Sequence, residues 1–188
     1  RYRDSASKAE YYLAYAAGAL GQLKDSVALG EQALTHARDA GNTDDLARIM
    51  NNLGVAHAAL GNRLEAADYY QQAYKLYQSW HDESRAARIQ ANRGALLIEY
   101  GNPDEGILDV RNALSVSEKP GDRNFQTFCL RVIATYLRNQ GRHKEAIDEL
   151  NKGLAIARER NLAENVTVMT IFLALSQFQT ADYDAARR

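Results

Sequence analysis

Proline and cysteine are almost absent from this sequence, and each absence excludes a class of structure. Only two prolines interrupt 188 residues, so long stretches are free of helix breakers. The residues that fill them, above all alanine, leucine, glutamate, lysine, arginine and glutamine, favour helices. The single cysteine, Cys129, allows neither an intramolecular disulfide nor a cysteine-rich zinc site. The sequence therefore predicts an all-α protein, and its cysteine content suits the reducing cytoplasm, where we expect it.

Net charge and long apolar runs are missing too. The formal net charge is −1 at pH 7, so bulk charge attracts neither nucleic acid nor an anionic membrane. The most apolar stretch, residues 166–178, is shorter than the about 20 residues of a membrane-spanning helix. With 46% hydrophobic and 25% charged residues, the composition is that of a soluble folded protein. We expect no nucleic-acid partner and no membrane partner for this segment.

Motifs for catalysis and metal binding are also lacking. The sequence has no glycine-rich phosphate loop, no HExxH and no GxSxG motif. Its histidines, His36, His57, His81 and His143, are too far apart for a local metal motif. We interpret His57 and Cys129 as packed side chains rather than functional groups. The sequence therefore predicts no enzymatic activity, no cofactor and no metal site.

What the sequence does contain is a repeat of forty residues. Its clearest markers are the glycines Gly21, Gly61, Gly101 and Gly141. A second break follows each glycine, at residues 39–45, 79–84, 118–123 and 158–164. Each repeat therefore predicts two helices, the first of which ends at a glycine that can adopt the left-handed conformation. In the third copy, Asn102 can cap the second helix and Pro103 suits its first position. Such pairs bury their apolar faces by stacking on one another.

The repeat resembles the tetratricopeptide repeat. The second copy carries the pattern best, with Leu53, Gly54, Gly61, Ala66, Tyr70 and Ala73. Its small residues let the two helices approach closely, and its large residues fill the space between them. The period of forty exceeds the usual 34 and is similar to that of long-repeat members such as kinesin light chains, cell-polarity adaptors, peptide-sensing bacterial regulators and maltose-type transcription activators. The resemblance implies an all-α, right-handed superhelical solenoid of antiparallel helix pairs.

The same spacing predicts how the chain is divided. We expect residues 1–188 to form a single domain that is a fragment of a longer protein, because both ends fall inside predicted helices. The units are expected at about residues 7–40, 47–80, 87–120 and 127–160, with a partial unit at 167–188. Ala181 stands at the glycine position of that last unit, where we predict a turn. An open apolar end that could mediate self-association is then predicted at Ile171, Phe172, Leu175 and Phe178.

The resemblance also implies a binding groove, because the first helices of this family line the inner surface. The positions carried onto this chain are Lys8, Tyr11, Tyr15, Arg48, Asn51, Asn52, Arg88, Asn92, Arg131, Thr135, Arg138 and Asn139. A cation recurs at the same place in the first three units, and Asn52 and Asn92 match the asparagine with which peptide-binding relatives hold a ligand's backbone or carboxylate. Guanidinium groups pair with carboxylates and amides bond to peptide backbone. The pattern therefore favours an extended acidic peptide as the ligand.

Other interpretations of these residues remain open. Arg48 and Arg88 can instead pair with Asp45, Asp82 or Glu83 on a solvated surface, and the two groove tyrosines can serve packing alone. The function predicted is a protein–protein interaction scaffold that binds an acidic peptide segment. One alternative is the ligand- or peptide-sensing domain of a bacterial transcription regulator. A second is self-assembly through the apolar end.

Overall fold

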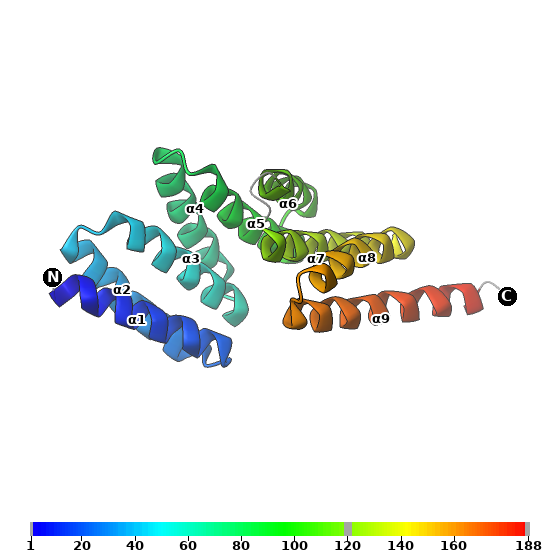
Figure 1. Ribbon diagram of the computed structural model, residues 1–188, viewed down its shortest axis with the longest axis horizontal. Helices are drawn as coiled ribbons and strands as arrows, with labels where there is room; N and C mark the ends of the chain where they lie inside the picture. Colours follow the sequence, from blue (N-terminus) through cyan, green and yellow to red (C-terminus); the bar gives the residue numbers. More distant parts are fainter. Residues whose placement is uncertain (1, 119–121, 187–188) are drawn as a thin grey trace. The chain divides into compact units, whose positions relative to one another are not determined.

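The chain is helical throughout the part that the structure describes. The structure is a computed structural model, and it describes residues 2–118 and 122–186, with the side chains of residues 5–117 and 122–179. Within these residues there are nine α-helices and no strands. The helices (Figure 1) are α1 (Tyr2–Ala19), α2 (Leu23–Ala40), α3 (Thr43–Leu60), α4 (Arg63–Ser79), α5 (Glu83–Tyr100), α6 (Pro103–Glu118), α7 (Arg123–Asn139), α8 (His143–Glu159) and α9 (Ala163–Ala186). The predicted all-α fold is confirmed.

Side-chain caps define where the helices begin. The helices α3, α5 and α7 are each preceded by a residue whose side-chain oxygen accepts a hydrogen bond from the backbone N–H three residues later, at 2.9–3.2 Å. These caps, forty residues apart, are Asn42, Asp82 and Asp122. Asn102 caps α6 in the same way, accepting the N–H of Glu105 at 3.4 Å, and Pro103 is the first helical residue, as predicted. Each cap satisfies a helix-terminal N–H that has no partner within the helix.

Left-handed residues close the helices. Gly21, Gly61 and Gly141 have φ angles of 76°, 81° and 73°, as predicted for the ends of first helices. The prediction is wrong for Gly101, which is not among the positive-φ residues. The N–H of Gly101 still donates to the carbonyl of Leu97 at 2.9 Å, as in a continuing helix. Pro103, which starts α6, restricts the preceding Asn102 to extended conformations.

The second break of each repeat uses the same conformation, which the sequence pattern did not reveal. Gly41, His81 and Asn161 have φ angles of 66°, 54° and 53°. Part of the third break, residues 119–121, lies outside the described residues. The described left-handed turns thus recur after nearly every helix, which keeps the links between helices very short.

Replacing His81 with glycine is expected to raise the free energy of unfolding by up to about 1 kcal/mol. The left-handed conformation costs a residue with a side chain about 1–2 kcal/mol, and the greater chain entropy of unfolded glycine offsets part of the gain. The His81 side chain is exposed, so little packing is lost. Urea denaturation followed by circular dichroism measures the change, with His81→Ala as a control that should leave stability nearly unchanged. A His81→Gly variant less stable than the parent would contradict the expectation.

Two compact units divide the chain, residues 1–96 and residues 97–188, and each is described by itself. In the first unit α1 packs on α2, α2 on α3 and α3 on α4, and α1 also contacts α3. In the second unit α6 packs on α7, α7 on α8 and α8 on α9, and α7 also contacts α9. First helices of successive repeats (odd-numbered) therefore lie side by side in each unit. The single-domain organisation stays a prediction.

Small and large residues alternate in the core of the first unit. Ala66 and Ala73 of α4 are fully buried, and Tyr70 between them is 3% exposed beside Gly54 of α3. His57 is buried with its ring stacked on Tyr69 at 5.5 Å. In the second unit the only cysteine of the sequence is fully buried. The predicted burial of His57 and of Cys129 is confirmed.

The last helix differs from the prediction. We expected a turn at Ala181, but α9 runs from Ala163 to Ala186 as one helix, so this prediction is wrong. Alanine is the strongest helix former and, unlike glycine, is disfavoured in the left-handed conformation that ends the other first helices. Residues 187–188 of the predicted partial unit lie outside the described residues.

Candidate functional site

A cavity of about 470 Å³ opens between first helices in the first unit. We call it the arginine cavity. It is lined by Tyr11, Asp44, Arg48, Asn51, Tyr77, Arg85, Arg88 and Ile89. The cavity brings together four of the predicted groove residues: Tyr11 from α1, Arg48 and Asn51 from α3, and Arg88 from α5. Arg48 and Asn51 are three residues apart on α3 and share a helix face, which explains why the sequence could group them.

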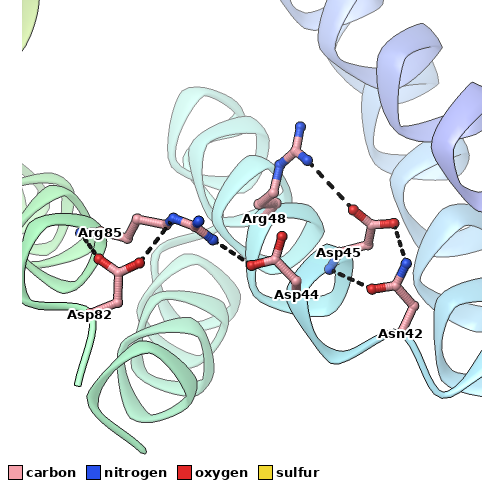
Figure 2. A network of polar contacts seen from close by, with 6 residues as sticks. All are labelled: Asn42, Asp44, Asp45, Arg48, Asp82 and Arg85. Atoms are coloured by element: carbon pink, nitrogen blue, oxygen red, sulfur yellow. Dashed lines mark hydrogen bonds and ion pairs between the residues drawn. The ribbon is translucent and has the colours of Figure 1, made fainter. Parts of the chain in front are cut away.

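Ion pairs join the cavity's arginines to nearby carboxylates (Figure 2). Arg85 bonds to Asp44 of the neighbouring first helix and pairs with its own helix cap, Asp82, at 3.0 Å. Arg48 lies 3.5 Å from Asp45, whose carboxylate also accepts a bond from the Asn42 side chain at 2.6 Å. One pairing expected from the alternative interpretation, that of Arg48 with Asp45, is thus present. The Arg85 pairs are exposed or half-exposed and contribute only about 0–1 kcal/mol each, whereas Asp45 is buried.

Aromatic rings hold the same arginines in place. The Arg48 guanidinium lies 4.7 Å from the ring centroid of Tyr11, and that of Arg85 lies 5.6 Å from the ring centroid of Tyr77. Burial opposes the charged form of Arg48, but hydrogen bonds with Tyr12 and Tyr11 outweigh it and raise its pKa. The Arg48 charge is therefore fixed in position at the cavity wall, with its carbon stem and guanidinium plane against an aromatic face.

An asparagine contact links neighbouring first helices. The side-chain amide of Asn92 donates to Oδ1 of Asn51 at 2.9 Å, and in the second unit Asn165 donates to Oδ1 of Asn124 at 3.1 Å. Both pairs are 41 residues apart, as are the partners in the Asp44–Arg85 bond. Adjacent first helices therefore touch at an offset one residue longer than the repeat. The forty-residue spacing of the sequence did not predict that Asp44, Tyr77 and Arg85 line the cavity.

A second cavity in the first unit, about 400 Å³, is mainly apolar. Small residues of α1 and α3, such as Ala14, Ala56 and Ala59, line it together with Tyr15 and Asn52. Asn51 lines both cavities, so they meet at this residue. The Nδ2 atom of Asn52 is buried and has no hydrogen-bond partner among the residues described.

Arginine and phenylalanine side chains stack on one another in the second unit. Arg131 lies 5.3 Å from the ring centroid of Phe128 and 5.5 Å from that of Phe172, and Arg138 lies 5.4 Å from the Phe172 centroid. A cavity of about 190 Å³ beside Arg131 is lined partly by Val168 and Met169. Two predicted groove residues on α7 thus meet a residue that the sequence had assigned to the open apolar end.

Residues 5–79 match the model of the tetratricopeptide repeat family. This segment belongs to the tetratricopeptide repeat family. The sequence has no match among curated proteins.

Solved structures resemble the whole chain. The apo form of RapI has a TM-score of 0.77 at 17% identity, with 97% of this chain and 70% of that chain covered. A kinesin light chain-like protein of Podosopora anserina, with nearly identical TPR-like repeats, has a TM-score of 0.71 at 15% identity, with coverage of 100% and 92%. A Rap protein complexed with competence and sporulation factor has a TM-score of 0.56 at 16% identity, with coverage of 94% and 53%. This chain thus spans about half the length of the Rap protein in that complex. The similarity to these three structures shows the tetratricopeptide-type fold.

The other predicted groove positions on the tetratricopeptide-type helices lie outside the three cavity linings. Lys8 and Asn139 are exposed, and Asn92 and Arg138 contact neighbouring first helices as described above. Thr135 donates its hydroxyl to the carbonyl of Arg131 at 3.0 Å, within its own helix. These positions add charge and polarity to the first-helix face without forming part of the cavities.

The predicted apolar end is only partly open. Ile171, Leu175 and Phe178 are 54%, 49% and 67% exposed, whereas Phe172 is half-buried beneath two guanidinium groups.

Among the described residues, no helix is both long and apolar enough to span a membrane, and no cluster of His, Cys, Asp and Glu could hold a metal ion.

Proposed function

We propose that this chain is a protein–protein interaction module that binds an extended, acidic peptide segment on its first-helix face. The observation that carries the proposal is the arginine cavity, in which Tyr11, Arg48, Asn51 and Arg88 converge from three first helices. A cavity of several hundred Å³ with convergent polar groups is the usual form of a ligand site. The tetratricopeptide family match supports a role in binding proteins rather than in catalysis.

The charge of the cavity supports an acidic ligand. Its lining residues include three arginines and one carboxylate, Asp44. Asp44 and Asp82, which pair with Arg85, are exposed and half-exposed, so these pairs are weak, whereas Asp45, which pairs with Arg48, is buried. A ligand carboxylate that bonds to a guanidinium through both oxygens forms a stronger contact than a single-contact pair. An acidic side chain can therefore replace the partners of Arg85 at little cost.

Amide groups beside the cavity suit a peptide backbone. The Nδ2 of Asn52, which has no partner within the described part of the chain, is a donor that a backbone carbonyl would satisfy. The Asn51 amide stands where the arginine cavity meets the apolar cavity. Arg48 and Val55 are seven residues apart on α3, about 10 Å along the axis, which equals about three residues of extended chain. A peptide with an acidic residue and an apolar residue at this spacing would fill both cavities.

Replacing Arg48 and Arg88 together with alanine is expected to weaken peptide binding at least about tenfold, the loss expected for a charge-assisted contact. Asp45 keeps its bond from Asn42 in this variant, so the fold should survive. A peptide selected on the parent chain from a random display library serves as the probe, and fluorescence anisotropy gives its Kd. The matched control is Arg38→Ala with Arg158→Ala, two exposed arginines on second helices. Equal affinity of the Arg48/Arg88 variant and the control would refute the groove assignment.

The second candidate is a sensor role in a larger regulator. It is favoured by the likeness to a Rap protein complexed with competence and sporulation factor. A sensor changes conformation when its ligand binds, so small-angle scattering with and without the selected peptide separates the two functions. A change in the radius of gyration supports the sensor, and an unchanged value supports the scaffold.

Self-assembly through α9 is a third proposal, resting on the exposed Ile171, Leu175 and Phe178. Apolar side chains on one face of a helix often mark a protein contact. Sedimentation measured over a range of concentrations tests it. A monomer at all concentrations would remove this alternative.

A further inference from the structure

The apolar cavity of the first unit has an equivalent position in the second unit, three repeats further along the chain. Helices α1 and α3, which carry most of the lining, correspond by the forty-residue spacing to α7 and α9. In both units the two helices are in contact. At this spacing Asn52 corresponds to Phe172, and Gly18 corresponds to Arg138. The two places can therefore be compared one side chain at a time.

In the second unit the chain itself fills this position. The ring centroid of Phe172 lies 5.5 Å from the guanidinium carbon of Arg131 and 5.4 Å from that of Arg138. The ring therefore lies along α7 between two residues that are about two turns apart. The corresponding stretch of α1, residues 11–18, contributes several of the side chains that line the apolar cavity. An aromatic ring in the second unit thus occupies the place that is a cavity in the first.

Small side chains keep the position open in the first unit. Asn52 stands where the second unit has the aromatic ring, and Gly18 stands where it has the arginine that stacks on the ring. Ala14 of α1 and Ala56 of α3 are buried, and each adds only a methyl group to the cavity wall. The resulting volume of about 400 Å³ falls within the range of natural small-molecule sites, about 300–1,000 Å³.

The polar groups of the cavity indicate the chemistry of a ligand. None of the described residues that line it carries a charge, so a charged molecule would lose its hydration without compensation. The Ser26 hydroxyl already donates to the Ala14 carbonyl at 2.8 Å, and Oδ1 of Asn51 accepts the Asn92 amide at 2.9 Å. The Nδ2 atom of Asn52 is buried and has no partner within the described part of the chain. A ligand oxygen that accepts from this atom would remove the cost of a buried, unsatisfied N–H group.

We propose that the apolar cavity binds a neutral small molecule with an aromatic body and a carbonyl oxygen, such as an aryl ketone. The aromatic body takes the place that Phe172 holds in the second unit, and the carbonyl oxygen accepts a hydrogen bond from Nδ2 of Asn52. Binding is driven by the removal of apolar surface of both partners from water. This site goes beyond the proposed function, because the molecule is a second ligand. It competes with the peptide, whose apolar residue is proposed to enter the same cavity.

Two probes of nearly identical shape test the site. Acetophenone has an aromatic ring and a carbonyl oxygen, and isopropenylbenzene has a CH₂ group in place of that oxygen. An NMR titration that follows the side-chain amide signals of Asn52 measures both. We expect acetophenone to shift these signals and to bind with a Kd about tenfold lower than that of isopropenylbenzene. A parent chain that binds neither probe, or binds both with the same Kd, would overturn the proposal.

Variants separate the donor from the cavity. Asn52→Ala removes the donor and keeps the cavity open, so the two probes should bind this variant equally. Ala59→Leu places a larger side chain at an exposed edge of the cavity and should weaken both probes at least about tenfold. The matched control is Ala16→Leu, at an exposed alanine of α1 outside the lining, which should leave both Kd values unchanged. Binding that survives Ala59→Leu, or a preference for the ketone that survives Asn52→Ala, would overturn the site.

The same probes keep this inference apart from the proposed function. Acetophenone should bind the variant with Arg48→Ala and Arg88→Ala as tightly as the parent, because neither arginine lines the apolar cavity. The direct titration therefore decides the site whether or not that variant loses the display-selected peptide. In the parent, saturating acetophenone should raise the Kd of that peptide. An unchanged peptide Kd would overturn the competition and the proposed place of the peptide's apolar residue.

Discussion

Replacing Leu53 with alanine is expected to lower the free energy of unfolding by about 3 kcal/mol, within the range for buried leucine. Leu53 is 1% exposed and belongs to the core of the first unit. It lies on α3 but reaches α2, because a Cβ built at Gly30 would stand 2.8 Å from its Cδ2 atom. The substitution therefore opens a cavity where the first repeat packs on the second. Urea denaturation followed by circular dichroism measures the loss.

A second substitution tests this explanation. In the parent, Gly30→Ala should destabilise the chain, because the added methyl group meets the Leu53 side chain. In the Leu53→Ala variant the same change should become stabilising, since the cavity accepts the methyl group and alanine exceeds glycine in helix propensity by about 1 kcal/mol. A Gly30→Ala effect of the same sign and size in both backgrounds would show that the two residues do not interact.

Replacing Gly54 with alanine is expected to cost about 2 kcal/mol, within the range for overpacking. A Cβ at this position would lie 2.5 Å from Cε1 and 2.6 Å from Cδ1 of Tyr70. That ring is 3% exposed and rigid, so α3 and α4 must move apart in a close-packed core. The loss would occur although alanine favours the helix more than glycine does. Thermal denaturation, read as a lower Tm, measures the effect.

The control for this prediction is a smaller side chain opposite the glycine. In a Tyr70→Leu variant the added methyl group meets a flexible side chain rather than a ring, so Gly54→Ala should cost much less or stabilise the helix. If Gly54→Ala left the Tm of the parent unchanged, the close approach of α3 and α4 would not be the reason for a glycine at this position.

The sequence predicted the fold because the markers of the repeat are local. Gly21, Gly61 and Gly141 end helices through backbone freedom that other residues lack, and this property belongs to the residue itself. The same logic failed at Gly101, where the following proline changes the turn, and at Ala181, which the pattern treated as a glycine. The left-handed conformation of His81 was not predictable, because it depends on the packing of the helices on either side.

The site was predicted in part for a similar reason. Arg48, Asn51 and Arg88 could be grouped because each lies on a face that the repeat position defines. Arg85 was missed because its partner on the preceding first helix is 41 residues away, and this offset depends on how one helix is shifted and rotated against the next. Phe172 was assigned to an apolar end, and only the structure reveals the two guanidinium groups on its ring.

The most direct test of acidic-peptide binding is the Kd of the display-selected peptide before and after its aspartates and glutamates are replaced with asparagine and glutamine. The change removes negative charge and keeps the shape of the ligand, so it isolates the contribution of the arginines on the first-helix face. We predict a Kd at least about tenfold higher after the replacement, at unchanged salt concentration. An unchanged Kd would contradict the account, because the ligand would then be recognised without its carboxylates.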